Sequence, residues 1–273
     1  MADAASQRLG LVADDVGMVY RRGKAATTAL IGCSLSVDRG SWASLIGPSG
    51  CGKSTLLRIF ADIVKPTSGT AMLHGLSPAD ARAARTFALV SQNSTMLPWR
   101  KIAENVALGL EVAGTIKSER QKRAAEAIEL VGLKGFERAY PSELSGGMRQ
   151  RAAIARALTL RPRFLLMDEP FGALDELTRR KLNFELLRIL RETSATLLLV
   201  THSIDEAVIL SDQVLVMSPR PGRMTKKVVI DFPHERSADV QDDPRFTAYA
   251  AELRHALHGD PAEAPAPRLK MSA

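Results

Sequence analysis

Short uninterrupted apolar runs recur along the chain from residue 42 onward, and longer amphipathic segments separate them. An apolar run of about five residues is typical of a strand that is buried on both faces, as in a parallel sheet. Such runs alternating with helical segments predict an α/β fold. The predicted strands lie at 42–46, 71–73, 86–90, 164–167, 195–200, 214–217 and 228–232.

Two runs in which apolar and polar residues alternate, 9–20 and 34–37, come before the first buried strand. Alternation is typical of a strand that faces the core on one side. A polar, basic stretch at 21–28 separates the two runs. We therefore expect a hairpin that belongs to a small antiparallel sheet, with a loop at 21–28.

Residues 98–160 carry no strand pattern and predict a helical insertion into the α/β core. Ser118 and Gln121 have the spacing of a capping box, which predicts the start of one helix. Ser145 is a candidate N-cap for another helix at 148–160.

The last third of the chain predicts three further helices. One follows Asp175, the second begins at an S-x-x-E capping box formed by Ser203 and Glu206, and the third is expected at 243–257. The first of these helices carries Leu177, Leu182, Leu186 and Ile189. Residues 1–8 and 259–273 are expected to be disordered tails, which leaves one domain at 9–257.

Composition and charge narrow the class of protein. The chain has 273 residues, of which 45% are hydrophobic and 25% charged, as in ordinary globular proteins. A formal charge of +7 suits nucleic acid, acidic lipid or plain solubility, and the scattered positive residues favour solubility. No apolar stretch approaches the ~20 residues that span a bilayer, and no signal peptide is evident. Two cysteines give no disulfide framework, so we expect a cytoplasmic protein that reaches a membrane through a partner.

The glycine-rich segment after the first buried strand fits G-x-x-x-x-G-K-[ST], a phosphate-binding loop. It consists of Gly47, Pro48, Ser49, Gly50, Cys51, Gly52, Lys53 and Ser54, and Thr55 follows it. Glycines let the backbone amides turn inward around an anion, and the following helix adds its positive end. Lys53 is placed to reach the β- and γ-phosphates and the Ser54 hydroxyl to bind Mg²⁺, so ATP and Mg²⁺ are the expected cofactors.

Two adjacent carboxylates, Asp168 and Glu169, follow the buried strand at 164–167. Such a pair repels unless a cation offsets the charge, which Mg²⁺ shared by Asp168 and Ser54 would do. Glu169 is then free to orient or deprotonate water. The alternative is a purely structural acid pair.

Other polar residues follow predicted strands, where open parallel sheets bind ligands. Gln92 follows the strand at 86–90 and is a candidate for contacting Mg²⁺ or the attacking water, or a solvated loop residue. His202 follows the strand at 195–200 and either hydrogen-bonds a γ-phosphate or is structural. Tyr20 either stacks on a nucleotide base or packs on the sheet.

The sequence Ser145, Gly146, Gly147 opens a helix with two glycines, which is costly unless something approaches the backbone closely. A second anion site at this helix start is one interpretation, and an ordinary capped helix is the other. Asp175 is a candidate N-cap in the same way.

In their order along the chain, these features resemble the ATP-binding subunit of an ABC transporter over residues 9–257. The resemblance implies a P-loop NTPase core with a mixed, mainly parallel sheet, a small antiparallel β subdomain and a helical subdomain that carries the signature motif. Gln92 and His202 fall at the family's Q-loop and switch-histidine positions, and Tyr20 at its base-stacking position. Glu169 is then the expected general base, and Ser54, Gln92 and Asp168 are the expected Mg²⁺ ligands.

The resemblance also implies a head-to-tail homodimer in the ATP-bound state. Each ATP would lie between the phosphate loop of one subunit and Ser145, Gly146 and Gly147 of the other. Asp175 would lie at the dimer seam. ATP favours the closed dimer because that state contacts the nucleotide from both sides.

Four further segments resemble the nitrate/sulfonate/taurine-type importer ATPases. They are 96–100, 104–107, 219–223 and 243–246. This likeness implies integral membrane permease subunits, an extracytoplasmic solute-binding protein as an indirect partner, and a place at the cytoplasmic face of the inner membrane. Trp99 is a candidate for the permease surface, or an anchor of the following helix. Met148 and Asp62 depart from the family pattern, where glutamine and glycine are usual, but neither binds phosphate.

A soluble ABC ATPase that acts on nucleic acid or ribosomes is the main alternative. Such proteins commonly carry two ATPase units or a long coiled-coil insertion, and this sequence shows neither, so no nucleic-acid partner is expected. A scaffold that does not hydrolyse ATP is a third hypothesis, and it is disfavoured by the intact Lys53, Asp168, Glu169 and His202. A phosphoryl-transferring kinase would leave the segment 144–150 without a role.

Overall fold

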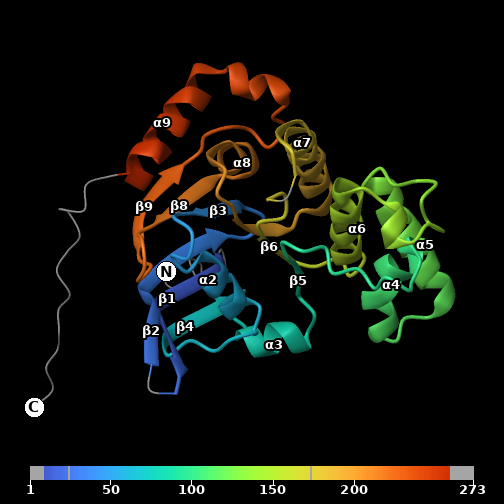
Figure 1. The fold of residues 1–273 in the computed structure, drawn as a ribbon, viewed down its shortest axis with the longest axis horizontal. Coiled ribbons are helices and arrows are strands. Elements are labelled where there is room, and N and C mark those ends of the chain that lie inside the picture. The colour runs from blue at the N-terminus through green and yellow to red at the C-terminus, as the bar shows by residue number, and fades with distance from the viewer. Residues whose placement is uncertain (1–8, 24, 173, 259–273) are drawn as a thin grey trace, which may run out of the picture.

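The computed structural model describes residues 9–23, 25–172 and 174–258, which form two sheets and their covering helices (Figure 1). The strands are β1 (Leu9–Arg22), β2 (Ala25–Asp38), β3 (Trp42–Ile46), β4 (Ser68–Leu73), β5 (Phe87–Val90), β6 (Phe164–Asp168), β7 (Thr196–Val200), β8 (Gln213–Met217) and β9 (Met224–Val229). The helices are α2 (Lys53–Phe60), α3 (Pro78–Ala83), α4 (Ile102–Val112), α5 (Lys117–Leu130), α6 (Gly146–Leu158), α7 (Glu176–Thr193), α8 (Ile204–Leu210) and α9 (Pro244–His258), with short 3-10 turns η1 (Pro141–Glu143) and η2 (Ala238–Asp242).

The larger sheet has the order β5-β6-β7-β3-β8-β9. Its first five strands are parallel, and β9 pairs antiparallel with β8 at the edge. The predicted α/β class and mainly parallel sheet are therefore confirmed. The last strand was predicted too late in the chain, because β9 spans Met224–Val229 rather than 228–232. The exposed lysines of this edge strand hide its pattern, since an edge strand needs little apolar surface.

The smaller sheet has the order β2-β1-β4 and is antiparallel. The loop predicted at 21–28 is wrong in extent, because β1 runs to Arg22 and β2 begins at Ala25. Tyr20 pairs with Thr27 and Arg22 with Ala25 in this ladder. The hairpin projects beyond the core, so its tip is held by backbone pairing and shows no apolar alternation.

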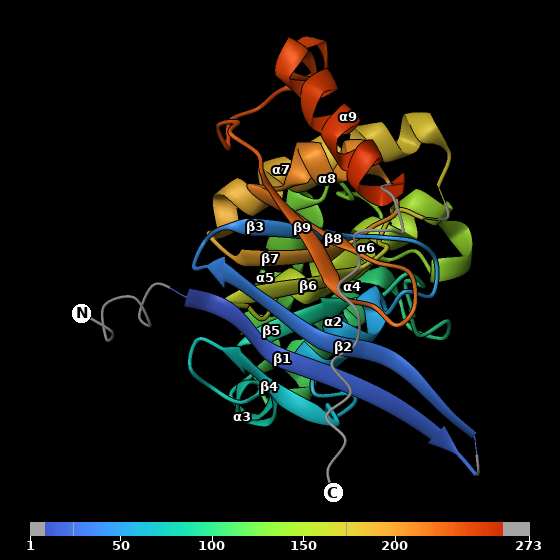
Figure 2. The same cartoon turned by 90° about the vertical axis from the view of Figure 1, so that its left-hand side faces the viewer.

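The six-stranded sheet lies between two layers (Figure 2). Helices α7, α8 and α9 cover one face, and α2 with the smaller sheet covers the other. Alternate residues of the buried strands divide between these layers, as the period of a strand requires. Leu165 and Leu197 pack on the α7 side, whereas Leu166 and Leu198 pack on the α2 side.

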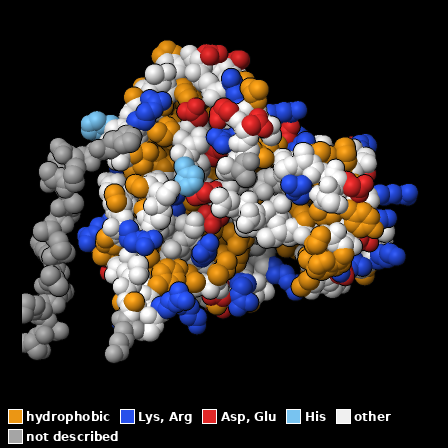
Figure 3. Space-filling view, in the orientation of Figure 1, with side chains coloured by type: hydrophobic (Ala, Val, Ile, Leu, Met, Phe, Trp, Pro, Cys, Tyr) orange, Lys and Arg blue, Asp and Glu red, His pale blue; other side chains and the backbone are white. Residues whose placement is uncertain are grey.

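Charged side chains of both signs are spread over the face shown in Figure 3. Lysine and arginine side chains lie on all parts of this face rather than in one patch. The positive charge is therefore distributed over this face.

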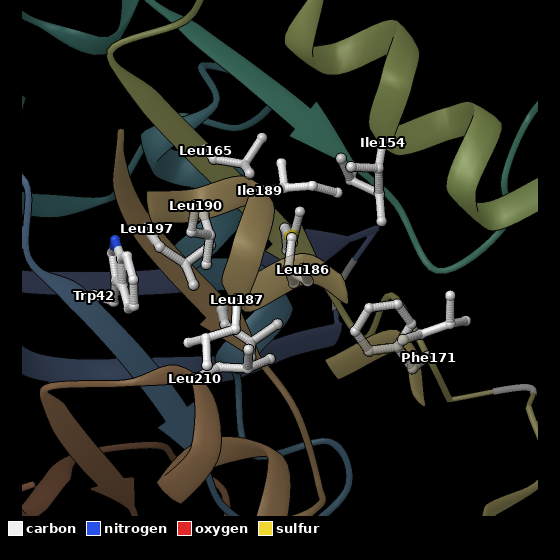
Figure 4. Close-up of a cluster of buried hydrophobic side chains, with 14 of the residues drawn as sticks. Trp42, Ile154, Leu165, Phe171, Leu186, Leu187, Ile189, Leu190, Leu197 and Leu210 are labelled. Carbon is white, nitrogen blue, oxygen red and sulfur yellow. The ribbon is translucent and has the colours of Figure 1, made fainter. Parts of the chain in front are cut away.

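The core beneath α7 is made of large aliphatic and aromatic side chains (Figure 4). Leu186 and Ile189 of α7 are buried there together with Trp42 and Phe171. Leu177, in the first turn of the same helix, is 83% exposed.

Helices α4, α5 and α6 form the predicted helical insertion, seen as a separate lobe in Figure 1. The start predicted from Ser118 is wrong, because α5 begins at Lys117 and has Ile116 as its N-cap. Met148, a departure from the family pattern, packs against the core. Asp62 adopts φ +53° just after α2, a backbone conformation that explains why glycine is usual there.

Within the described residues, no helix combines the length and apolarity needed to cross a bilayer. The tails predicted at 1–8 and 259–273 lie outside the described residues, as does Ala173.

Candidate functional site

The phosphate loop joins β3 to α2, which places it where a buried strand ends and a helix begins. Gly52 is the N-cap of α2 and adopts φ +116°, a conformation that residues with a side chain rarely take. A Cβ at Gly52 would also lie 2.5 Å from Leu30 Cδ2. The loop is therefore shaped by backbone freedom at one position and by contact with β2.

Lys53 is buried, with 4% of its surface exposed. Its Nζ donates to the carbonyl oxygens of Gly47 at 2.7 Å and Pro48 at 3.1 Å. The ammonium thus lies inside the curve of the loop, held by the backbone of the loop itself. This position offers a positive charge to an anion within the loop.

The structure brings Ser54 and Asp168 together across 114 residues of sequence. The Ser54 hydroxyl donates to Asp168 Oδ1 at 2.7 Å. A hydroxyl and a carboxylate are hard oxygen donors, and Mg²⁺ commonly takes one or two protein ligands beside phosphate oxygens and water. The donor set therefore fits Mg²⁺ in the company of a nucleotide.

Glu169 contacts both of the other predicted catalytic residues. His202 Nε2 lies 2.6 Å from Glu169 Oε2, and Gln92 Nε2 donates to the same oxygen at 3.2 Å. Glu169 adopts φ +49°, which is uncommon for a residue with a side chain, and its amide donates to Val200 O. Strained backbone of this kind is concentrated at functional sites, where the surrounding structure holds it.

The signature sequence lies at the start of α6, on the helical lobe. Ser145 is the N-cap, and its hydroxyl accepts from the Met148 amide at 3.3 Å. Ser145 and Gly146 are exposed, whereas Gly147 is buried against α7. Across the described part of the chain, no hydrogen bond joins this helix start to the phosphate loop of the same protomer.

Two other predicted residues have clear local partners. Tyr20 lies near the end of β1, 38% exposed, with its hydroxyl 3.4 Å from Thr55 Oγ1 at the phosphate-loop helix. Asp175 is the N-cap of α7 and accepts from the Thr178 amide at 3.0 Å. That amide hydrogen bond lowers the pKa of Asp175.

The sequence patterns missed the contact of Arg220 with the phosphate loop. Arg220 Nε donates to Gly50 O at 3.1 Å from the turn between β8 and β9. Gly222 of the same turn lies so close that a Cβ there would be 2.0 Å from Cys51 O. The proline- and glycine-rich sequence at 219–223 signals a turn, but nothing in it indicates what the turn packs on.

Glu206 was also assigned too simple a role. Ser203 caps α8 by accepting from the Glu206 amide, but the predicted return bond from the Glu206 side chain to the Ser203 amide is wrong. The Ser203 amide donates to Thr201 Oγ1 instead, and the Thr201 hydroxyl donates to Glu206 Oε2. Burial raises the pKa of Glu206. Glu206 is only 3% exposed. A capping residue does not need such burial, so Glu206 has a further role in tertiary packing.

Both cysteines are buried and free, in keeping with the absence of a disulfide framework. The Cys33 thiol donates to Gly222 O at 3.3 Å, and burial raises its pKa to about 11. This thiol is therefore an inert core group behind the turn at 219–223.

The phosphate loop lies at the carboxyl ends of the parallel strands, beside the Ser54–Asp168 pair and the Glu169 cluster. This arrangement defines a P-loop nucleoside triphosphatase. The family model described as "ABC transporter" matches residues 30–172. The chain belongs to the ABC transporter family, and its cassette binds and hydrolyses ATP.

Relatives support the same assignment. The taurine import ATP-binding protein TauB of Burkholderia pseudomallei is 44% identical over 242 residues, which cover 87% of this chain and 92% of the relative. TauB of Rhizobium johnstonii is 45% identical over 236 residues, covering 84% of this chain and 89% of the relative. The ATP-binding cassette MJ0796, solved as a dimer in a post-hydrolysis state with ADP and Pi, aligns with a TM-score of 0.72 at 29% identity. That alignment covers 82% of this chain and all of the other.

Proposed function

We propose that this chain, through a single ATP-binding domain at 9–257, is the ATPase subunit of an importer for a sulfonate of the taurine type. The relatives named for taurine import match most of its length, and residues 96–100, 219–223 and 243–246 carry the same subgroup likeness. The subunit works at the cytoplasmic face of the inner membrane, bound to a permease that an extracytoplasmic binding protein supplies with solute.

One observation supports the hydrolytic role above all others: Gln92 and His202 both contact Glu169 Oε2, beside the Ser54–Asp168 pair. Mg²⁺, when bound at Ser54, Asp168 and Gln92, supplies charge neutralisation at the β- and γ-phosphates. Lys53 and the loop amides bind those phosphates. Glu169 accepts the proton of the attacking water, and His202 orients the carboxylate and the γ-phosphate.

The exposed start of α6 supports a head-to-tail dimer. Ser145 and Gly146 are exposed at this helix start. The first N–H groups of a helix have no partner within it, which suits the γ-phosphate of a partner's ATP. The dimeric form of the similar cassette agrees with such an arrangement. Tyr20 stacks on the adenine of its own protomer, and Asp175 lies at the seam.

The helical lobe offers a surface for the permease. Trp99, 71% exposed, comes just before α4, so the view of it as a buried helix anchor loses support. The next residue, Arg100, lines a cavity of about 630 Å³ between α4 and α5, with Ala103, Ala107 and Ile128 on its apolar part. Arg100 and Glu111, an ion pair at 2.7 Å, border the cavity. An apolar hollow with a charged rim suits a short helix of a partner.

Replacing Glu169 tests the hydrolytic proposal. Glu169→Gln keeps the size and a hydrogen-bond acceptor but cannot accept a proton, so we expect ATP binding to remain and turnover to fall by about 10²–10⁴-fold. Steady-state ATPase rates measure turnover. Gel filtration with ATP and Mg²⁺ detects the ATP-bound dimer, which forms only if the variant still binds ATP. A wild-type rate in this variant contradicts the general-base assignment.

Co-purification from gently solubilised membranes tests the transporter proposal. A multi-span permease recovered with the tagged chain supports it, and sulfonate uptake by the reconstituted complex identifies the solute. Recovery with ribosomes or nucleic acid in the soluble fraction contradicts it.

A further inference from the structure

An ion pair joins the first turn of α8, which follows the loop that carries His202, to the first turn of α7. Glu206 Oε1 lies 3.5 Å from Arg179 Nε, and the side chain of Glu206 is 4% exposed. The Thr201 hydroxyl donates to the other carboxylate oxygen, Oε2. One oxygen of this buried carboxylate thus accepts a hydrogen bond and the other faces the guanidinium, which also pairs with the exposed Glu176 at 2.9 Å.

The Arg179 end of the pair leads to the signature sequence. Its second terminal nitrogen donates to Leu174 O at 2.8 Å. A Cβ built on Gly146 would lie 3.7 Å from Leu174 Cδ2, and one on Gly147 would lie 3.2 Å from Thr178 Cγ2. The first turn of α7, which Asp175 caps, therefore packs directly on the start of α6.

The Glu206 end leads to the catalytic cluster. Thr201 precedes His202, and its hydroxyl oxygen also accepts from the Ser203 amide at 3.0 Å. The backbone on both sides of His202 is thereby fixed to one side chain. His202 then contacts Glu169.

We propose that Arg179 and Glu206 are positioning residues that couple the two ATP sites of the dimer. The inference rests on the proposed head-to-tail dimer, in which the α6 start serves the partner's ATP and His202 serves its own. When ATP at one site shifts the start of α6, the first turn of α7 moves with it and carries the Arg179 guanidinium. Glu206 follows, because a buried charge left without its partner is costly. Thr201 and His202 are displaced in turn.

ATP hydrolysis by the full-length chain over a range of ATP concentrations tests the coupling. Wild type should be cooperative, with a Hill coefficient above 1. Glu206→Gln keeps an acceptor for the Thr201 hydroxyl but removes the charge, and Arg179→Gln removes the guanidinium. Each should bring the Hill coefficient close to 1 and change the half-saturating ATP concentration by about 5-fold or more. The double variant should have the same Hill coefficient as either single variant, because each of the three variants breaks the same link.

Arg188→Gln is the matched control, because it removes an arginine of the same helix whose partners, Glu192 and the Leu130 carbonyl, are not part of this link. It should keep the wild-type Hill coefficient. Thermal unfolding without nucleotide detects a merely structural role: variants of Arg179 or Glu206 that unfold earlier yet stay fully cooperative overturn the coupling. A wild-type chain that hydrolyses ATP without cooperativity and without an ATP-dependent dimer overturns the proposed dimer instead, and the coupling with it.

Discussion

The two regions that we propose to contact ATP are built in opposite ways. In the phosphate loop, Lys53 is buried and bonded to carbonyls of its own loop, and Ser54 is held by Asp168. At the signature sequence, Ser145 and Gly146 are exposed, and the Ser145 hydroxyl serves its own helix. The phosphate loop, enclosed by its own chain, can bind ATP without a partner. The exposed start of α6 contacts ATP only when a partner subunit presents it. The comparison predicts that damage to the first abolishes binding, and damage to the second abolishes assembly.

Gly52→Ala should have the largest effect, because it affects both fold and binding. The new Cβ clashes with Leu30, and the alanine backbone has to adopt φ +116°. Such strain costs about 1–3 kcal/mol or more. Each kcal/mol lowers Tm by about 2–4 °C in a chain of this size. Calorimetry and titration of the chain with ATP should show a lower Tm and a loss of ATP binding without any partner being involved. A variant that binds ATP normally would break the comparison.

Gly146→Ala is the matched change in the signature region, and its effect should be confined to the dimer. A Cβ there has its nearest neighbour at 3.7 Å, an ordinary contact, so the fold accommodates it. Alanine also loses less backbone entropy on folding than glycine. We expect unchanged ATP binding by the monomer, an unchanged or slightly raised Tm, and loss of the ATP-dependent dimer in a Glu169→Gln background. Sedimentation with and without ATP measures this outcome. A dimer that forms as readily as before would count against the signature contact.

Arg220→Ala should weaken the phosphate loop without changing the fold. The hydrogen bond from Arg220 to Gly50 O fixes the outer side of the loop, and a typical hydrogen bond contributes about 0.5–1.5 kcal/mol net. The Kd for ATP should rise by about 2–10-fold. Arg223→Ala in the same turn is the control and should bind ATP like wild type. If both variants raise the Kd equally, the cause is the general loss of positive charge and the hydrogen bond from Arg220 to Gly50 has no specific role.

The smallest effect should be a dependence of stability on pH at Glu206. Burial, the largest cause, raises its pKa, and Arg179, Glu176 and His202 are the charged groups that act on it. A carboxyl group with a raised pKa binds protons more strongly in the folded state, so its stabilising contribution is present at low pH. That contribution is lost as pH rises from the unfolded value of about 4.3 through the raised folded value. Glu206→Gln removes the titration, so wild type should lose stability relative to the variant across this window. Thermal unfolding of both proteins from pH 4 to 7 measures it, and a constant difference would contradict it.

The sequence by itself determined the fold class and most of the site. Buried parallel strands have to be apolar on both faces, so β3, β6, β7 and β8 are legible as runs. The phosphate loop is equally legible, because its chemistry is local: glycines, a lysine and a serine within eight positions. Strand ends also place side chains in a known way, since the carboxyl ends of parallel strands share one edge. Asp168, Glu169, Gln92 and His202 could be assigned to that edge for this reason.

Only the tertiary structure decided what those groups touch. Arg220 contacts Gly50 across 170 residues, and the pair of Arg179 and Glu206 links the first turns of two helices that the sequence presents as separate capping motifs. The edge strand β9 and the tip of the first hairpin escaped the pattern for a related reason. Their stability comes from backbone pairing with a neighbour, which any side chain permits. Periodicity records which side of an element is buried, whereas the partner of a polar group depends on how distant elements pack.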